Sequence, residues 1–166
     1  MDLEIDVEKW PDGPWAVLSE EAAQAAISVA PELANQRLSV SILFTSDEEI
    51  HILNHKWREK DQPTNVLSFP MLERDEILAL SPAGPPVLLG DIVLASETCA
   101  REAQEKSVSL PAHAAHLVIH GFLHLAGYDH VDSVHEAEKM EALETMALAK
   151  MGIAAPYEED RIQESD

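Results

Sequence analysis

The chain has 166 residues, of which 46% are hydrophobic and 25% charged, a composition typical of a globular protein. Its 31 acidic and 11 basic residues give a formal net charge of −20, which taken alone argues against a nucleic-acid partner. The single cysteine excludes an internal disulfide, and neither a secretory signal nor an apolar run long enough to span a membrane is visible. We therefore expect a cytoplasmic protein with no membrane partner.

The first third of the chain shows strand and helix patterns in turn. Apolar residues at every second position predict a strand over residues 2–8. Ser19 is a candidate N-cap for an alanine-rich helix, which Pro31 ends. A second alternating run predicts another strand over residues 38–44.

A helix and a short strand are predicted next. Residues 46–49 have the capping-box pattern Ser-x-x-Glu and open a helix. Its end carries three bases close together, Lys56, Arg58 and Lys60. For the two lysines, an interaction with the helix dipole is the simpler explanation. A turn then leads into a strand that ends at Pro70.

Residues 71–86 have no clear period and contain several prolines, so we interpret them as a mobile loop. Residues 87–95 are apolar enough for an inner strand, and Ser96 is the expected cap of the next helix. In that helix Cys99 fits a small buried side chain better than a nucleophile. A histidine-rich helix then starts at residues 110–111.

The last predicted helix begins at a second capping pattern, residues 133–136, and stops at Gly152. We expect residues 1–156 to form a single domain and residues 157–166 a flexible acidic tail. The interleaved elements predict an α+β fold. This fold is a small mixed sheet of about four strands packed with five or six helices, and a cluster of histidines predicts a zinc site on a helix of the C-terminal half and the turn after it.

The histidine-rich helix is the clearest candidate for chemistry. His120 and His124 are one helical turn apart, so both imidazoles project from one face. Gly127 can adopt a positive φ, which ends the helix and lets the chain bring His130 back towards the pair. Three imidazoles from a helix and a turn suit a catalytic zinc that keeps one position for water. We therefore predict one Zn²⁺ held by His120, His124 and His130, and no organic cofactor.

The spacing of these histidines also occurs in metzincin proteases, whose general base is a glutamate directly after the first histidine. That position holds Gly121 here, which argues against peptide hydrolysis. His116, one turn earlier, fits several roles: support of a ligand, contact with substrate, a cap or a core position.

Four segments carry recognisable motifs. Residues 120–130 read HGFLHLAGYDH, residues 58–70 read REKDQPTNVLSFP, residues 90–93 read GDIV and residues 140–144 read MEALE. In order and spacing they resemble the YbeY family of bacterial rRNA maturation endoribonucleases, whose signature is HGxLHLxGYDH. The resemblance runs from about residue 39 to residue 152 and does not reach the first forty residues. One departure is Glu59, where the family usually has glycine.

The resemblance implies a zinc-dependent, single-strand-specific endoribonuclease, a hydrolase of phosphodiester bonds. Its expected roles are ribosomal RNA processing, notably 3′ end maturation of the small-subunit RNA, and ribosome quality control. It implies that Arg58 and His120 are catalytic, that Arg58 binds substrate, and that the metal ligands are those named above. The clustering of bases around Arg58 adds Lys60 as a second candidate for substrate binding. The implied partners are single-stranded or ribosomal RNA, the small ribosomal subunit and its assembly factors.

Two alternatives stay open from the sequence. The first is a non-catalytic ribosome-assembly factor that zinc merely stabilises, and the second, weaker one is a metzincin-like peptidase. The attacking group, a zinc-bound hydroxide or the 2′-hydroxyl of the RNA, also stays open.

Overall fold

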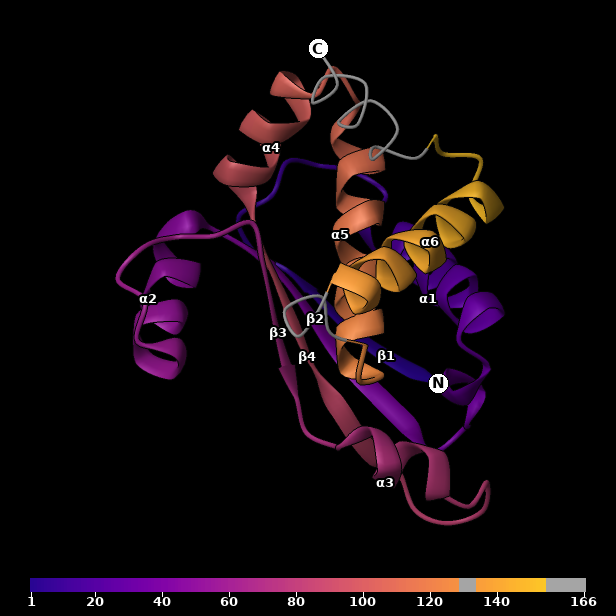
Figure 1. Cartoon of the computed structure of the whole chain (residues 1–166). Coiled ribbons are helices and arrows are strands. Elements are labelled where there is room, and N and C mark those ends of the chain that lie inside the picture. Colours follow the sequence, from indigo (N-terminus) through magenta and orange to yellow (C-terminus); the bar gives the residue numbers. More distant parts are fainter. Residues whose placement is uncertain (129–133, 155–166) are drawn as a thin grey trace.

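The computed structural model describes residues 1–128 and 134–154. In this part of the chain one four-stranded sheet is packed with six α-helices and a short 3-10 helix, which confirms the α+β fold (Figure 1). The strands are β1 (Asp2–Val7), β2 (Leu38–Thr45), β3 (Val66–Pro70) and β4 (Val87–Ala95). The helices are α1 (Trp15–Val29), η1 (Pro31–Ala34), α2 (Asp47–Arg58), α3 (Arg74–Ala79), α4 (Ser96–Glu105), α5 (Leu110–Leu125) and α6 (Val134–Lys150). The expected tail and the cap at residue 133 lie outside the described residues.

The strand order is β1-β2-β4-β3. β1, β2 and β4 are parallel, and β3 pairs with β4 in the antiparallel direction at one edge. This order agrees with composition, because β4 is almost continuously apolar and occupies an inner position, whereas the edge strand β1 alternates with acidic residues. β3 is thereby left at the edge beside α2, with one of its faces towards α5.

The two faces of the sheet are covered by different helices (Figure 1). α1 and α5 pack on one face, whose buried side chains include Ile42 and Ile92, and α6 packs on these two helices. The other face carries Leu43 and Val93, and α2 packs on it through Ile50. No helix within residues 1–128 and 134–154 is both long and apolar enough to cross a membrane.

The prediction that Ser19 caps the first helix is wrong. α1 already begins at Trp15, and Ser19 is buried within it, where its hydroxyl donates a hydrogen bond of 2.7 Å to the Trp15 carbonyl. Trp15 is buried against Trp10, with 4.8 Å between their ring centroids. Burial of this aromatic side chain therefore places the helix start ahead of the polar residue that the sequence favours as a cap.

The interpretation of residues 71–86 as a mobile loop missed a helix, because the segment contains α3. Its N-cap is Glu73, whose side chain forms a reciprocal capping box with Glu76. Ser96 likewise begins α4 without capping it. The first turn of α4 is bound instead by the Asp47 carboxylate of α2, which accepts hydrogen bonds of 2.9 Å and 2.6 Å from the backbone and hydroxyl of Thr98.

Candidate active site

A pocket of about 460 Å³ lies between β3 and α5. It brings together two segments that are about sixty residues apart in the sequence. Its lining residues are Arg58, Lys60, Thr64, Asn65, Val66, Ser68, His120 and His124. Four of the five residues predicted for the site therefore surround one cavity, and the fifth, His130, lies outside the described residues. Strand alternation explains the lining, because Val66 and Ser68 share one face of β3.

His120 and His124 lie side by side on α5. Their ring centroids are 4.5 Å apart and their planes meet at 74°. His120 is 23% exposed and bonds through Nδ1 to the carboxylate of Glu144, which is 1% exposed on α6. Because a carboxylate accepts this bond, Nδ1 carries the proton and the ring is held in one tautomer and orientation.

Glu144 also binds His116, whose Nε2 is 3.4 Å from the second carboxylate oxygen. Burial favours the neutral acid, but the hydrogen bonds from His116 and His120 outweigh it and lower the pKa of Glu144 to about 2. Glu144 is therefore an ionised carboxylate in the core at neutral pH. His116 is buried and does not line the pocket, so its place fits support of His120 through their shared acceptor.

Sequence reasoning did not single out Glu144 as part of the site. It falls one helical turn after Met140, on the buried face of α6, among apolar residues. A charged residue on the apolar face of an amphipathic helix is the signal that could have identified it, because burial of a carboxylate requires a partner.

The donor set fits a borderline metal ion such as zinc. Two imidazoles line the same pocket, and the engagement of His120 Nδ1 by Glu144 assigns Nε2 to a metal. Within residues 1–128 and 134–154 no three histidine, cysteine or acidic side chains are grouped closely enough to hold a metal. Cys99 does not line this pocket; it is fully buried in α4, and burial raises its pKa to about 12.

Gly121, which holds the position of the metzincin glutamate, also packs closely against the sheet. A Cβ atom at this position would lie 2.9 Å from Cδ1 of Ile92 on β4. Any side chain at this position would therefore require Ile92 to shift, and the glutamate of a metzincin would require more room than an alanine. The structure thus gives a physical reason for the missing general base.

Arg58 is the last residue of α2, and Glu59 is its C-cap. Glu59 has φ 57° and ψ 27°, the left-handed conformation that glycine adopts most readily. The backbone N–H of Lys60 then donates to the Asn54 carbonyl at 3.2 Å, so the helix ends in a tight turn. The residue that departs from the family motif therefore keeps a conformation suited to the usual glycine.

Glycine at position 59 is accordingly expected to stabilise the protein. The change Glu59→Gly removes a left-handed strain of about 1 kcal/mol, and the free energy of unfolding should rise by a similar amount. Urea denaturation measures this change. Glu48→Gly, in the exposed first turn of the same helix, is the matched control and should lower stability by about 1 kcal/mol. A Glu59→Gly protein no more stable than wild type would contradict the prediction.

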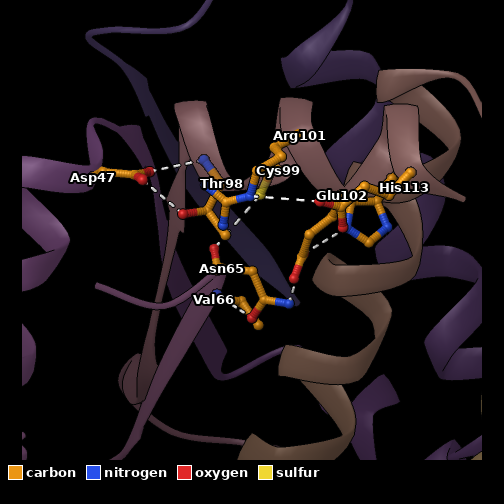
Figure 2. A network of polar contacts seen from close by, with 9 residues as sticks. Asp47, Asn65, Val66, Thr98, Cys99, Arg101, Glu102 and His113 are labelled. Atoms are coloured by element: carbon orange, nitrogen blue, oxygen red, sulfur yellow. Dashed lines mark hydrogen bonds and ion pairs between the residues drawn. The ribbon is translucent and has the colours of Figure 1, made fainter. Parts of the chain in front are cut away.

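A polar network holds the strand side of the pocket (Figure 2). Asn65 donates a hydrogen bond of 3.0 Å to Glu102 on α4, and Glu102 also pairs with the buried His113 of α5 at 2.9 Å. The Asn65 side-chain oxygen accepts a bond of 2.7 Å from the Val66 backbone. Because Asn65 lines the pocket, this network ties the start of β3 to both α4 and α5.

Glu102 should make stability depend on pH. The hydrogen bond from His113 lowers its pKa, burial opposes this, and the bond from Asn65 lowers it further. A carboxyl whose pKa is lower in the folded state stabilises the fold above its ordinary pKa of 4.5, and this contribution is lost as the pH falls further. Glu102→Gln should therefore cost about 1 kcal/mol at pH 7 and progressively less below pH 4.5.

Urea denaturation of wild type and of Glu102→Gln tests this prediction. The measurements run from about pH 3 to about pH 8, which spans the titration of a carboxyl. Glu105→Gln, exposed on the same helix, is the control and should show no such dependence. A stability difference between wild type and Glu102→Gln that stays constant over this range would contradict the assignment.

Most of the chain matches proteins of one family. The family model described as Endoribonuclease YbeY matches residues 14–152, so the match begins well before residue 39, where the motif resemblance starts. A protein of Erythrobacter litoralis named Endoribonuclease YbeY is 64% identical over 95% of this chain and 98% of its own length. One of the same name from Novosphingobium aromaticivorans is 56% identical over 93% and 95%. The solution structure of TM1509 from Thermotoga maritima matches 90% of this chain and 91% of its own, with a TM-score of 0.57 and 27% identity.

Proposed function

Because the chain belongs to the YbeY endoribonuclease family, we propose that the pocket between β3 and α5 is its active site and cleaves single-stranded ribosomal RNA with one zinc ion. As a member of this family the protein is a metal-dependent endoribonuclease of ribosomal RNA processing, a hydrolase whose substrate is RNA. The non-catalytic alternative and the peptidase alternative have no support among these relatives. The observation that carries the proposal is that Arg58 and Lys60 line the same cavity as His120 and His124.

The metal would be held by His120 and His124, together with His130. When bound, zinc supplies a Lewis acid that polarises a phosphoryl oxygen and makes a water more acidic. The ionised Glu144 keeps the His120 ring in the orientation that a ligand needs. The proposed site thus has the three predicted ligands and one buried carboxylate, Glu144, which orients His120 and binds no metal itself.

The basic side of the pocket would bind the scissile phosphate. Arg58 presents a planar guanidinium that pairs with two phosphate oxygens and stabilises the extra charge of the transition state. Lys60 adds a second positive charge two residues later. The proposed preference for single strands fits the pocket, because about 460 Å³ lies within the size range for a small ligand and suits an unstacked nucleotide.

The small ribosomal subunit and its assembly factors are the proposed partners. With a net charge of −20 the protein is repelled by bare RNA over most of its surface, so a protein partner would help to deliver the substrate.

A larger groove of about 810 Å³ lies on the opposite face of the sheet, with Asp6, Glu8 and Asp91 among its lining residues. Trp57 and Met71 also line it and are 62% and 60% exposed. An apolar groove with carboxylates suits a basic protein segment.

Mapping of ribosomal RNA ends in cells tests the biological role. Cells that carry only His124→Ala should accumulate small-subunit RNA with extended 3′ ends. Cells with Glu138→Ala, a change on the exposed face of α6, should process this RNA as wild-type cells do. Normal 3′ ends in the His124→Ala cells would refute the proposed role.

A further inference from the structure

The turn after α5 is held by a cluster of side chains from two distant segments. Arg74, the first residue of α3, donates a hydrogen bond of 2.9 Å from Nη1 to the Ala126 carbonyl, which belongs to the C-cap of α5. Tyr128 donates a bond of 2.7 Å to Glu32 of η1, and Arg74 pairs with the same Glu32 oxygen at 3.3 Å. Helix α3 lies near the end of α5 that leads into this turn (Figure 1).

The stem of Arg74 also fits the backbone of the turn closely. Gly127 has φ +99°, and a Cβ atom added there would lie 2.7 Å from the Cβ of Arg74. The guanidinium carbon of Arg74 is 4.5 Å from the centroid of the Tyr128 ring, and Lys139 of α6 is 5.7 Å from the same centroid. Tyr128 is thus fixed by a hydrogen bond at its hydroxyl and by cations against its ring.

These contacts exceed what the helix end itself needs. The backbone N–H groups of Gly127 and Tyr128 already bond to the carbonyls of His124 and Leu123, both at 3.0 Å, and close the turn. The Arg74 bond satisfies one more carbonyl at the negative end of the helix dipole. The remaining contacts, between Arg74, Glu32 and Tyr128, fix the direction in which the chain leaves α5.

The exit direction of the chain governs where the third predicted imidazole can lie. His124 lies in the last turn of α5, and His130 comes two residues after Tyr128. A tridentate site requires the third imidazole to meet the first two within a few tenths of an ångström, so any freedom in the turn lowers metal affinity. We propose that Arg74, Glu32 and Tyr128 are positioning residues that set the metal affinity of the site by fixing the exit of the chain from α5. This inference rests on the proposed function, because it presupposes that the histidines bind a metal.

Arg74→Met tests the inference, because methionine keeps much of the stem and removes the guanidinium. Zinc affinity, measured by competition with a chromogenic chelator, should fall about tenfold. The absorption spectrum of the Co²⁺-loaded variant should also change, which reports ligand geometry independently of activity. Tyr128→Phe is a milder variant that leaves the ring in place; it should weaken zinc binding less and add little to Arg74→Met, because both act through one cluster.

The chain offers a matched control in Arg37. This arginine also binds backbone carbonyls of the segment between β3 and β4, those of Pro85 at 3.0 Å and Ser81 at 3.1 Å. Arg37→Met should therefore lower the melting temperature about as much as Arg74→Met and leave zinc affinity and the Co²⁺ spectrum unchanged. Equal zinc affinity of Arg74→Met, Arg37→Met and wild type would overturn the inference.

His120→Ala separates the positioning role from the metal site itself. If it loses zinc binding while Arg74→Met binds as wild type does, the positioning role is wrong and the metal site stands. If His120→Ala keeps full zinc affinity, the proposed metal site itself is wrong, and the inference falls with it.

Discussion

Alanine in place of Arg58 is expected to lower kcat/KM for single-stranded RNA by about 100- to 1,000-fold, the range for removal of one charged group that stabilises a transition state. Arg58 ends α2 and lines the pocket opposite His120 and His124. It is exposed, so its truncation should leave the fold intact. Cleavage of an end-labelled RNA by the zinc-loaded protein measures the loss.

Two further variants make this result specific. Arg58→Lys keeps the charge and loses the planar fork, so it should fall between wild type and Arg58→Ala. Arg101→Ala removes an arginine whose only described ion pair is 3.9 Å long and exposed, and it should cleave RNA as wild type does. Unchanged cleavage by the Arg58→Ala protein would show that Arg58 has no role in the proposed site.

Alanine in place of Glu144 should lower both the stability of the protein and its affinity for zinc. The substitution removes a buried, ionised acceptor that His116 and His120 share. Loss of one partner of a buried pair costs about 3 kcal/mol, and loss of a group that orients a metal ligand weakens metal binding by about 10- to 100-fold. Urea denaturation of the metal-free protein and zinc titration against a chelator measure the two effects separately.

Glu144→Gln separates the effect of the shape of the side chain from the effect of its negative charge. Glutamine fills the same space and still offers one oxygen acceptor to His120, so it should be less unstable than Glu144→Ala yet still bind zinc more weakly than wild type. Glu138→Ala on the exposed face of the same helix is the control and should match wild type in both measurements. If Glu144→Ala matched this control, the buried carboxylate would have no role in the site.

The elements of the fold that depend on local pattern could be predicted from the sequence. The alternation in β2, the Ser46 cap of α2 and the stop of α5 before Gly127 all agree with the structure. The predictions failed where contacts distant in sequence decide. Packing of Trp15 against Trp10 starts α1 early, and the cap of α4 comes from Asp47 on another helix.

The residues of the site also fall into those that a local pattern predicts and those that distant contacts determine. His120 and His124 could be identified from their spacing alone, because the period of a helix places them on one face. Arg58 and Lys60 could be linked to them only through resemblance to a family, since the strand order that places β3 beside α5 is not a local property. Glu144 and Arg74 act through contacts between distant elements, so no pattern within their own segments reveals what they bind.

The central claim is that the histidines of α5 bind the metal on which RNA cleavage depends. It is tested most directly by cleavage of a labelled single-stranded RNA with protein that a chelator has stripped of metal and that is then reloaded with Zn²⁺. We predict that stripped wild-type protein is inactive, that zinc restores its cleavage, and that zinc fails to restore the His124→Ala protein. Cleavage by stripped protein at the reloaded rate, or equal recovery of His124→Ala, would contradict the account.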